Sequence, residues 1–317
     1  MTDVLLAVAE RSGLTEQYFN GSVAVTGPAG EITAALGDID RAFFIRSAAK
    51  PFQAWVAHEA GLDVPPTHLA LVCASHSGDP VHVAIVRDIL RRHGLDESAL
   101  ACPRSRPFLA ADRRLAASGD LEPSAVYHNC SGKHAGILAA CRAAGLDTQS
   151  YLEPSHPLQQ RVGELIAEVT GDEVGPPGVD GCGMPVWRVT AGGLARAYHR
   201  LAVDERFASV RSAMSRYPTL VSGEGRGDGS IGRWTGGVAK GGAAGCMGAA
   251  VAGRGMAVKS WSGNGEVAAL GVVLALEWLG ILTRSLADGM AGVFRPPVYG
   301  GGKEVGRIRP AAVLETM

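Results

Sequence analysis

The sequence lacks an imbalance of charge. Its 30 basic and 31 acidic side chains give a formal net charge of −1, and no long run of either sign occurs. A protein that binds a polyanion usually carries an excess or a cluster of positive charge. We therefore expect no nucleic-acid partner.

Long apolar runs are also lacking. The most apolar segment, residues 267–282, contains Glu277 and is shorter than the stretch of about 20 residues that spans a bilayer. We interpret it as a buried core helix and expect no membrane partner. The first residues include an acidic Asp3, where an export signal has basic residues, so we expect a cytoplasmic location.

The cysteines show no disulfide framework. Six cysteines stand far apart in the chain, at positions 73, 102, 130, 141, 182 and 246. A chain of 317 residues can bury a large core without covalent cross-links. Free thiols in a reducing compartment are the expectation.

The hydrophobic pattern predicts sheet-forming segments at both ends of the chain. A hairpin is expected at 21–38 around the turn signal "GPAG", and small-residue strands at 234–265 turn at "GRG" and "SGNG". A last strand is expected at 304–314. Strands from the two ends would then join in one sheet.

Helical spacing fills the middle of the chain. Segments with this spacing that end at a glycine are 80–94, 131–145 and 156–171, and helical spacing returns at 190–216. Between these helices, 171–187 is rich in glycine and proline and predicts an ordered loop.

This order predicts an α+β fold in which an antiparallel sheet formed by both chain ends packs beside a helical lobe. We expect a single catalytic domain, 1–317, with a sheet lobe of about 1–60 and 220–317 and a helical lobe of about 61–219.

A serine and a lysine stand three residues apart where a helix is expected to begin. Positions i and i+3 of a helix share a face, so Ser47 Oγ and Lys50 Nζ could meet within one turn. A neutral lysine amine can take the proton of a serine and make it a nucleophile. The alternative is that Ser47 only caps the helix and Lys50 is a solvated surface residue.

Two more segments carry the same residue types. "CASHSGD" at 73–79 supplies further serines, and "AKGGAAG" at 239–245 supplies a lysine on a small-residue strand. This order of serine–lysine, serine and K-x-G resembles the layout of serine β-lactamases, penicillin-binding proteins and serine-dependent glutaminases.

Longer motifs narrow the resemblance. They are "RSAAKPFQ" at 46–53, "CASHSGD", "HNCSGKHAGIL" at 128–138, "HPLQQ" at 156–160, "DGCGMPVW" at 180–187 and "AKGGAAG". Together they resemble the Rhizobium-type L-asparaginases, often called the asparaginase II family, over most of residues 10–280.

The resemblance implies a serine β-lactamase/glutaminase-like fold and two catalytic serine–lysine pairs. These pairs fall on Ser47 with Lys50 and on Ser75 with Lys240. Ser47 is the preferred nucleophile, or else a partner in proton relay.

The second pair has alternatives. Ser77 is a rival for Ser75, because the sequence "SHS" does not say which hydroxyl points inward. Lys259 is a rival for Lys240, which is preferred because the glycines after it would let a substrate lie against the strand.

Three further residues are expected to bind substrate. By the resemblance, Arg46 would bind a carboxylate with its planar guanidinium, and Asp180 would bind the α-ammonium group. His134 would orient a ligand or a hydroxyl, with a core histidine as the alternative, and Asp180 could instead only stabilise a turn.

Similar enzymes bind zinc through two cysteines and a lysine, which implies a possible Zn²⁺ site at Cys130, Lys133 and Cys182. The alternative is that both cysteines are small buried hydrophobic residues and that Lys133 contacts substrate without metal.

The resemblance therefore implies hydrolysis of L-asparagine to L-aspartate and ammonia by a homodimer. The alternatives are a glutaminase or a β-lactam-hydrolysing relative, and a non-catalytic sensor that binds asparagine.

One segment departs from the family pattern, and a glycine-rich segment needs to be distinguished from a phosphate-binding loop. "AAG" follows "AKGG" where an acidic residue is expected. The glycine-rich "GEGRGDGS" at 223–230 resembles the family's turn before that strand, and it is too irregular to be a phosphate-binding loop.

Overall fold

The structure is a computed structural model that describes residues 4–107, 122–223, 225–312 and 314–316. Four sequence expectations depend partly on positions outside the described residues. These positions are Asp3, near the start of the chain, 108–121, in the expected helical lobe, Glu224, in the glycine-rich 223–230, and Val313, in the strand expected at 304–314.

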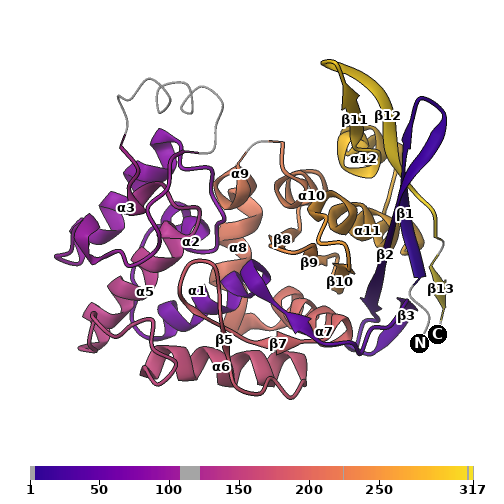
Figure 1. Ribbon diagram of the computed structural model, residues 1–317. Coiled ribbons are helices and arrows are strands. Elements are labelled where there is room, and N and C mark those ends of the chain that lie inside the picture. The colour runs from indigo at the N-terminus through magenta and orange to yellow at the C-terminus, as the bar shows by residue number, and fades with distance from the viewer. Residues whose placement is uncertain (1–3, 108–121, 224, 313, 317) are drawn as a thin grey trace.

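An antiparallel sheet joins the two ends of the chain (Figure 1). Its strands run in the order β11-β12-β1-β2-β10-β9-β8, and β3 pairs with both β2 and β13. The bounds are β1 Val4–Arg11, β2 Leu14–Thr26, β3 Ile32–Leu36, β8 Val238–Gly242, β9 Cys246–Val251, β10 Arg254–Ser260, β11 Pro297–Gly300, β12 Lys303–Pro310 and β13 Glu315–Thr316.

Helices fill most of the chain between these strands. They are α1 Lys50–Glu59, α2 Pro66–Val72, α3 Pro80–Arg92, α5 Ser131–Ala144, α6 Pro157–Thr170, α7 Ala191–Val203, α8 Ala208–Arg216 and α9 Pro218–Ser222. The later helices are α10 Gly227–Thr235, α11 Gly265–Trp278, α12 Arg284–Gly289 and α13 Ala291–Phe294. Short two-residue strands, β4 Phe43–Phe44 with β7 Arg188–Val189 and β5 Gly178–Val179 with β6 Pro185–Val186, lie outside the main sheet.

The predicted α+β fold, with a sheet from both chain ends beside a helical lobe, is confirmed. Figure 1 shows α1, α2, α3, α5 and α6 on one side of the molecule and the strands of the main sheet on the other, with both termini on the sheet side. The division into lobes of about 1–60 with 220–317 and about 61–219 stays a prediction.

The predicted helices end where the sequence stops them. α5 and α6 are each followed by a glycine in the left-handed region, Gly145 at φ 67° and Gly171 at φ 70°. This conformation closes a helix without the steric cost that a Cβ would add.

One expectation about the later part of the chain is confirmed and another is wrong. The helical spacing expected at 190–216 forms α7 and α8, with a break at Asp204, whose side chain accepts a hydrogen bond from Arg206 N and caps a new turn. The glycine-rich 223–230 is not only a turn, because α10 begins at Gly227. Packing overrides low helix propensity there, since a Cβ on Gly227 would lie 2.5 Å from the Ala269 Cβ.

Both faces of the central strands are covered. On β10, Met256 and Val258 belong to the hydrophobic cluster that contains α11, whereas Ala257 belongs to the cluster that contains α7. Successive residues of a strand point to opposite faces, so small apolar residues are needed on both. This explains why 246–258 is rich in alanine, valine and glycine.

A glycine on β9 lets a helix from the other layer approach the sheet closely. A Cβ on Gly248 would lie 2.1 Å from a ring carbon of Tyr198 on α7. The Tyr198 hydroxyl donates a hydrogen bond of 2.9 Å to the carbonyl oxygen of Ala48, just before α1. The sheet thereby fixes the start of α1.

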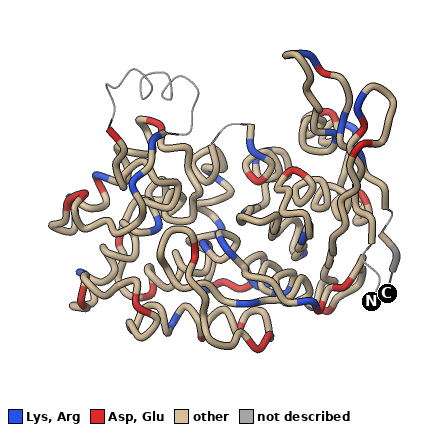
Figure 2. Tube along the Cα trace, in the orientation of Figure 1, with Lys and Arg blue, Asp and Glu red and all other residues tan. Residues whose placement is uncertain are grey.

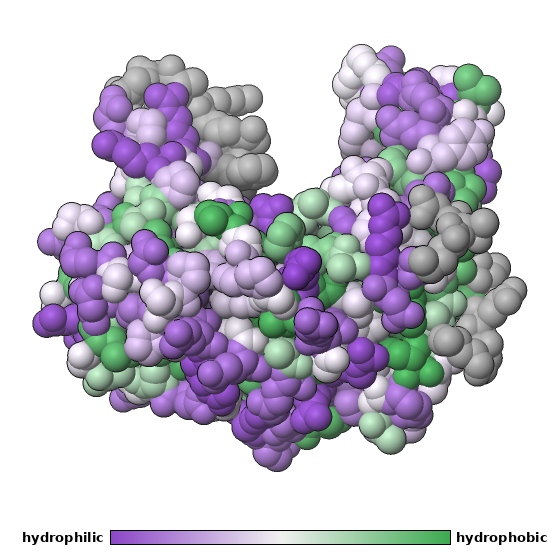
Figure 3. Space-filling view, turned by 60° about the horizontal axis from the view of Figure 1, so that its bottom comes forward, coloured by the Kyte–Doolittle hydropathy of each residue, from purple (hydrophilic) through white to green (hydrophobic). Residues whose placement is uncertain are grey.

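The surface is mixed in character. Basic and acidic residues are interspersed over both sides of the molecule (Figure 2). On the face shown in Figure 3, hydrophilic residues cover most of the surface and hydrophobic residues form small separate patches. None of the described helices is long and apolar enough to cross a membrane.

Substitution of Gly248 by alanine should destabilise the protein by about 1–3 kcal/mol, because the added Cβ would displace the Tyr198 ring. Chemical denaturation measures this change. Gly292→Ala is the matched control, since nothing lies within 4 Å of its Cβ position. Equal unfolding free energies for the two variants would contradict the packing described here.

Candidate active site

A 3-10 turn, η1 Arg46–Ala49, leads into α1 and carries the first candidate serine. The turn is held from both sides, because Ile45 N donates to Trp187 O at 3.1 Å and Tyr198 donates to Ala48 O. Arg46 has a φ of 50°, which is rare for a residue with a side chain. Such backbone strain persists only where the surroundings enforce it.

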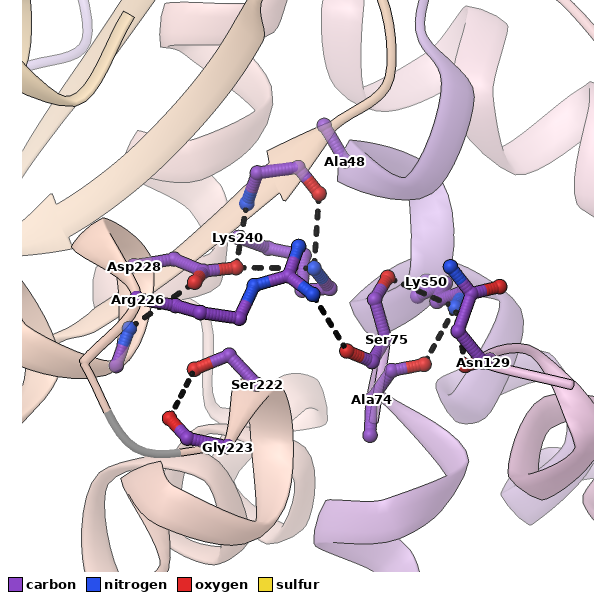
Figure 4. Close-up of polar contacts among 12 residues, drawn as sticks. Ala48, Lys50, Ala74, Ser75, Asn129, Ser222, Gly223, Arg226, Asp228 and Lys240 are labelled. Carbon is purple, nitrogen blue, oxygen red and sulfur yellow. Dashed lines mark hydrogen bonds and ion pairs between the residues drawn. The ribbon is translucent and has the colours of Figure 1, made fainter. Parts of the chain in front are cut away.

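Lys50 is the first residue of α1 and is completely buried. Its amine donates to the carbonyl oxygen of Ala74, to Ser75 Oγ at 3.0 Å and to the carbonyl oxygen of Asn129 at 3.5 Å (Figure 4). Thus the lysine connects the start of α1 with the segments that follow α2 and precede α5.

The expected contact of Ser47 with Lys50 does not form. Both residues are described, and no hydrogen bond between them is present in the described part of the chain. The physical reason is burial, since a buried amine must satisfy its hydrogens and the Ala74 and Asn129 carbonyls supply acceptors. Lys50 therefore reaches across to Ser75 rather than along its own turn.

The pKa of Lys50 falls from the ordinary value of 10.5 to about 8. Burial is the main cause, because a dry environment disfavours the charged form. Cys130 opposes this shift, and the positive charges of Lys240 and Lys133 add to it. An appreciable fraction of the amine is then neutral near pH 8 and can accept the proton of Ser75.

Ser75 and its rival Ser77 have different surroundings. Ser75 lies on the wall of a cavity and bonds to Lys50, and its carbonyl oxygen accepts a hydrogen bond of 3.4 Å from Arg226 Nη1. Ser77 Oγ instead donates to Asp79 Oδ2 at 2.9 Å, at the start of α3. The structure brings Ser75, and not Ser77, to the buried lysine.

The two candidate strand lysines also differ. Lys240 on β8 is completely buried and forms an ion pair of 3.0 Å with Asp228 Oδ2. Lys259 on β10 donates to the carbonyl oxygens of Ala244 and Ser260 and lies 5.4 Å from the Trp261 ring centroid. Of the two, Lys240 is among the main charges that act on Lys50.

The predicted pairing of Lys240 with Ser75 is not a direct hydrogen bond among the described contacts. The partner of Lys240 is Asp228, which the sequence interpretation missed. A signal was present, because Asp228 is the acidic residue nearest before "AKGG" in the glycine-rich segment. An acidic residue was expected after "AKGG" in the sequence. Instead, Asp228, which precedes "AKGG" in the sequence, contacts its lysine in the fold.

A second cluster contains two thiols and an amine. Lys133 on α5 is buried and donates to Cys182 Sγ at 3.1 Å. A hydrogen bond with Cys182 lowers the pKa of Cys130 and favours its thiolate. Burial acts to lower the pKa of Lys133, but the nearby thiols outweigh burial and raise it.

This donor set is compatible in type with zinc, which prefers sulfur and nitrogen ligands in tetrahedral sites. Among the described residues, no group of three or more His, Cys, Asp or Glu could hold a metal ion. A zinc ion here would therefore depend on the Lys133 amine, which must lose its proton to coordinate.

Arg46 and Asp180, expected to bind opposite ends of a substrate, pair with each other. Arg46 Nε donates to Asp180 Oδ1 at 2.6 Å, and the side chains are 28% and 10% exposed. Asp180 also accepts from Gly181 N at 2.8 Å. The pair offers one positive and one negative group side by side.

His134 lies in the core. Its Nδ1 is 2.7 Å from the Tyr151 hydroxyl, and burial lowers the pKa of the ring. Its Nε2 is buried and has no hydrogen-bond partner within the described chain. The contact with Tyr151 does not bring this histidine to the candidate serines.

Ser47 and Ser75 both line one cavity, which has a volume of about 850 Å³. Its wall also includes Asn129, Asp228 and the strand residues Gly241 and Gly242. The contacts in Figure 4 show Ser75 between Lys50 on one side and the Arg226, Asp228 and Lys240 group on the other. A hydroxyl on a cavity wall with a basic amine beside it supplies two of the parts that acyl transfer to serine requires, a nucleophile and a base.

Comparison with known proteins gives a family match. The family model described as L-asparaginase II matches residues 7–310. No curated protein matches this chain.

Several solved structures are similar. One is a β-lactamase from Mycobacterium bovis, with 19% identity, a TM-score of 0.43, and coverage of 86% of this chain and 94% of that chain. Another is a probable glutaminase, with 16% identity, a TM-score of 0.45, and coverage of 82% and 85%. At these TM-scores the two carry no argument about activity.

Lys50→Met should change how stability depends on pH. The folded protein releases the Lys50 proton near pH 8, while the unfolded chain holds it to about 10.5. The unfolded state then binds more protons in this window, so wild-type stability rises with pH. The wild type should gain about 2–3 kcal/mol relative to the variant between about pH 7 and 10.

Urea denaturation at several pH values measures this difference. Lys303→Met, at an exposed lysine on β12, is the control and should leave the difference constant. A Lys50→Met difference that does not vary with pH would show that the buried amine keeps its proton throughout.

Proposed function

The chain belongs to the L-asparaginase II family, and on that premise we propose that it hydrolyses the side-chain amide of L-asparagine to give L-aspartate and ammonia. Family membership supports an amidohydrolase. The single observation that carries a serine–lysine mechanism is the 3.0 Å contact of Lys50 Nζ with Ser75 Oγ beside the cavity.

The contact favours Ser75 as the hydroxyl that is activated. The Ser75 proton passes to the neutral Lys50 amine while Oγ forms a bond to the amide carbon. The carbon–nitrogen bond then breaks, and the nitrogen leaves as ammonia with the proton from Lys50. Water attacks the resulting ester, which releases the acid and restores the serine.

This assignment differs from the preference for Ser47 as nucleophile. Ser47 lies on the wall of the same cavity, and no described hydrogen bond joins it to a basic group. We propose that Ser47 assists the reaction from the opposite side, by holding substrate or passing a proton.

Asparagine has a zwitterionic head that suits the Arg46–Asp180 pair. The arginine would bind the α-carboxylate and the aspartate the α-ammonium, as the sequence predicts for each. Arg46 directly precedes Ser47, so a substrate bound there lies beside the turn that carries this hydroxyl. Such binding would exchange one ion pair for two, which supports an amino acid as substrate.

We also propose that Cys130, Lys133 and Cys182 can hold Zn²⁺. When bound, the ion would supply a Lewis acid that orients a substrate oxygen. The serine and lysine need no metal to form the nucleophile. A homodimer and a cytoplasmic location stay predictions.

The purified protein should release ammonia from L-asparagine, with a smaller kcat/KM for L-glutamine. Ser75→Ala and Lys50→Ala should each lower kcat by at least about 1000-fold, because both remove the activated nucleophile. Ser47→Ala should lower it less, and Ser77→Ala, at the neighbouring hydroxyl, should stay near wild type.

Each alternative has its own outcome in this assay. Preference for glutamine would indicate a glutaminase, and tight binding of asparagine in calorimetry with no ammonia would indicate a sensor. If Ser47→Ala is inactive and Ser75→Ala is active, the nucleophile is Ser47.

Metal analysis tests the zinc proposal separately from activity. Protein purified with zinc present should retain about one ion per chain, and Cys182→Ala should lose it, because two donors do not complete a tetrahedral site. Cys141→Ala should retain the metal, because Cys141 is a buried cysteine outside the cluster whose Sγ lies 3.8 Å from His156 Nε2. Wild-type protein without bound zinc would end this proposal.

A further inference from the structure

Asp228 occupies a position where its carboxylate is held as an anion. It lies in the first turn of α10, and only 4% of its surface is exposed. Its Oδ2 accepts from Lys240 Nζ and from Gly241 N, each at 3.0 Å, and its Oδ1 accepts from Gly229 N at 3.1 Å. Three donors at a helix N-terminus favour a negative charge.

The pKa of Asp228 is lowered to about 2. Burial acts in the opposite direction, so the charges of Lys240 and Arg226 and the Gly241 hydrogen bond outweigh it. The carboxylate is therefore ionised at neutral pH.

Lys240 is completely buried and donates to Asp228 Oδ2 and, at 2.8 Å, to the carbonyl oxygen of Gly241. An ammonium group away from water is costly unless an anion lies beside it. Here the anion is present and is itself fixed by backbone N–H groups. The ion pair is thus a fixed part of the site, with Asp228 in the wall of the cavity.

The other titratable or charged groups that face this pair do not supply an anion. Burial raises the pKa of Cys73 to about 12 and that of Cys246 to about 11, and it raises the pKa of Tyr198 well above its ordinary value. Lys50 and Arg226 are basic. Among the described groups around Lys240, Asp228 is the one anion at neutral pH.

Lys50 lies in equally dry surroundings, but none of its contacts in the described part of the chain is with a carboxylate. Its acceptors are the Ala74 and Asn129 carbonyls and the Ser75 hydroxyl, all of them neutral. The positive charges of Lys240 and Lys133 also disfavour a charge on Lys50, whereas Cys130 and Cys182 favour it, and burial outweighs these two. The two buried lysines therefore differ in their partners, since a carboxylate lies beside Lys240 and neutral acceptors lie beside Lys50.

We propose that Asp228 is a positioning residue that keeps Lys240 as a fixed ammonium, so that Lys50, and not Lys240, accepts the serine proton. The proposal rests on the proposed function for its activity readout. It also deepens that function, because it divides the two lysines into a base and a permanent charge.

A proton relay through Lys240 is excluded by this division. An ammonium nitrogen has no lone pair and cannot take the Ser75 proton. If it gave up a proton, it would leave the buried Asp228 carboxylate without its partner. The proton therefore moves from Ser75 Oγ to Lys50 Nζ and on to the departing nitrogen.

Asp228 also fixes the strand edge at the cavity. It accepts from the N–H of Gly241, while its partner Lys240 donates to the carbonyl of the same residue. Gly241 is part of the cavity wall. The pair thus sets both the charge and the backbone position on this side of the site.

The first experiment needs no activity. Asp228→Asn removes the anion, so the buried ammonium should lose its proton at lower pH in the folded state than in the unfolded chain. The variant then gains stability as pH rises. The difference in melting temperature between Asp228→Asn and wild type should narrow by about 4–8 °C between about pH 7 and 9.5.

Asp172→Asn is the matched control for this measurement. Asp172 is also a largely buried carboxylate, which accepts from Thr190 N at 2.7 Å and pairs with Arg196 at 3.5 Å. It does not pair with a buried lysine, so its difference from wild type should not vary with pH. A constant difference for Asp228→Asn as well would overturn the proposal.

The second experiment is the pH profile of kcat/KM. Wild-type activity should rise through about pH 8 as Lys50 becomes neutral and should then stay level to about pH 9.5. Asp228→Asn should give a bell-shaped profile, because the fixed charge is lost on the alkaline side. A lower rate with the wild-type shape would mean a merely structural role and would overturn the proposal.

Lys240→Arg and Lys50→Arg provide a test that does not need Asp228→Asn to fold. Arginine keeps a positive charge and cannot act as a base. Lys240→Arg should retain at least about 10% of wild-type kcat and exceed Lys240→Met, whereas Lys50→Arg should lose at least about 1000-fold. Equal activity of Lys240→Arg and Lys240→Met would overturn the proposal.

The wild type in the same series separates the two failures. Wild-type protein that releases no ammonia from any carboxamide contradicts the proposed function, and the melting experiment still decides the role of Asp228. Wild-type turnover with an unchanged Asp228→Asn profile contradicts only the inference.

Discussion

One buried amine organises the candidate site. Lys50 lies at the start of α1, and its nitrogen contacts the carbonyl after α2 and the carbonyl before α5. Removal from water lowers its pKa, and under the proposed function this single electrostatic effect would make the neighbouring Ser75 hydroxyl reactive. Cys130 and Lys240, the partner of Asp228, both act on the pKa of this amine, in opposite directions.

Two ion pairs of the candidate site differ in their exposure to water. The Asp228–Lys240 pair lies on the sheet side, with both charges buried and balanced. The Arg46–Asp180 pair is more exposed, and a solvated pair is more easily separated by a ligand. A dry pair suits a permanent role, whereas a partly wet pair suits binding and release.

Much of the fold could be predicted from local patterns. Helical spacing with a terminal glycine located α5 and α6, and alternating small residues located β8 to β10. These features depend on residues close in sequence. By contrast, the helix at Gly227 depends on packing against Ala269, which no local pattern encodes.

The same distinction applies to the candidate site. The sequence brought Ser47 and Lys50 together because they are three residues apart, but a lysine side chain reaches any acceptor within several ångströms. Burial and the Ala74 and Asn129 carbonyls decided its direction. Asp228 was missed for a related reason, since its partner Lys240 lies twelve residues away and meets it only through the pairing of α10 with β8.

The strand side of the cavity is bare of side chains at two successive positions, Gly241 and Gly242. A Cβ on Gly242 would lie 2.4 Å from Cys246 Sγ, so this bareness is enforced by the neighbouring strand. A molecule that enters the cavity meets the peptide groups of these two glycines directly, because no side chain lies between them and the molecule. These two positions therefore limit the thickness of a bound molecule, and the polar groups that they present to it are backbone N–H donors and C=O acceptors.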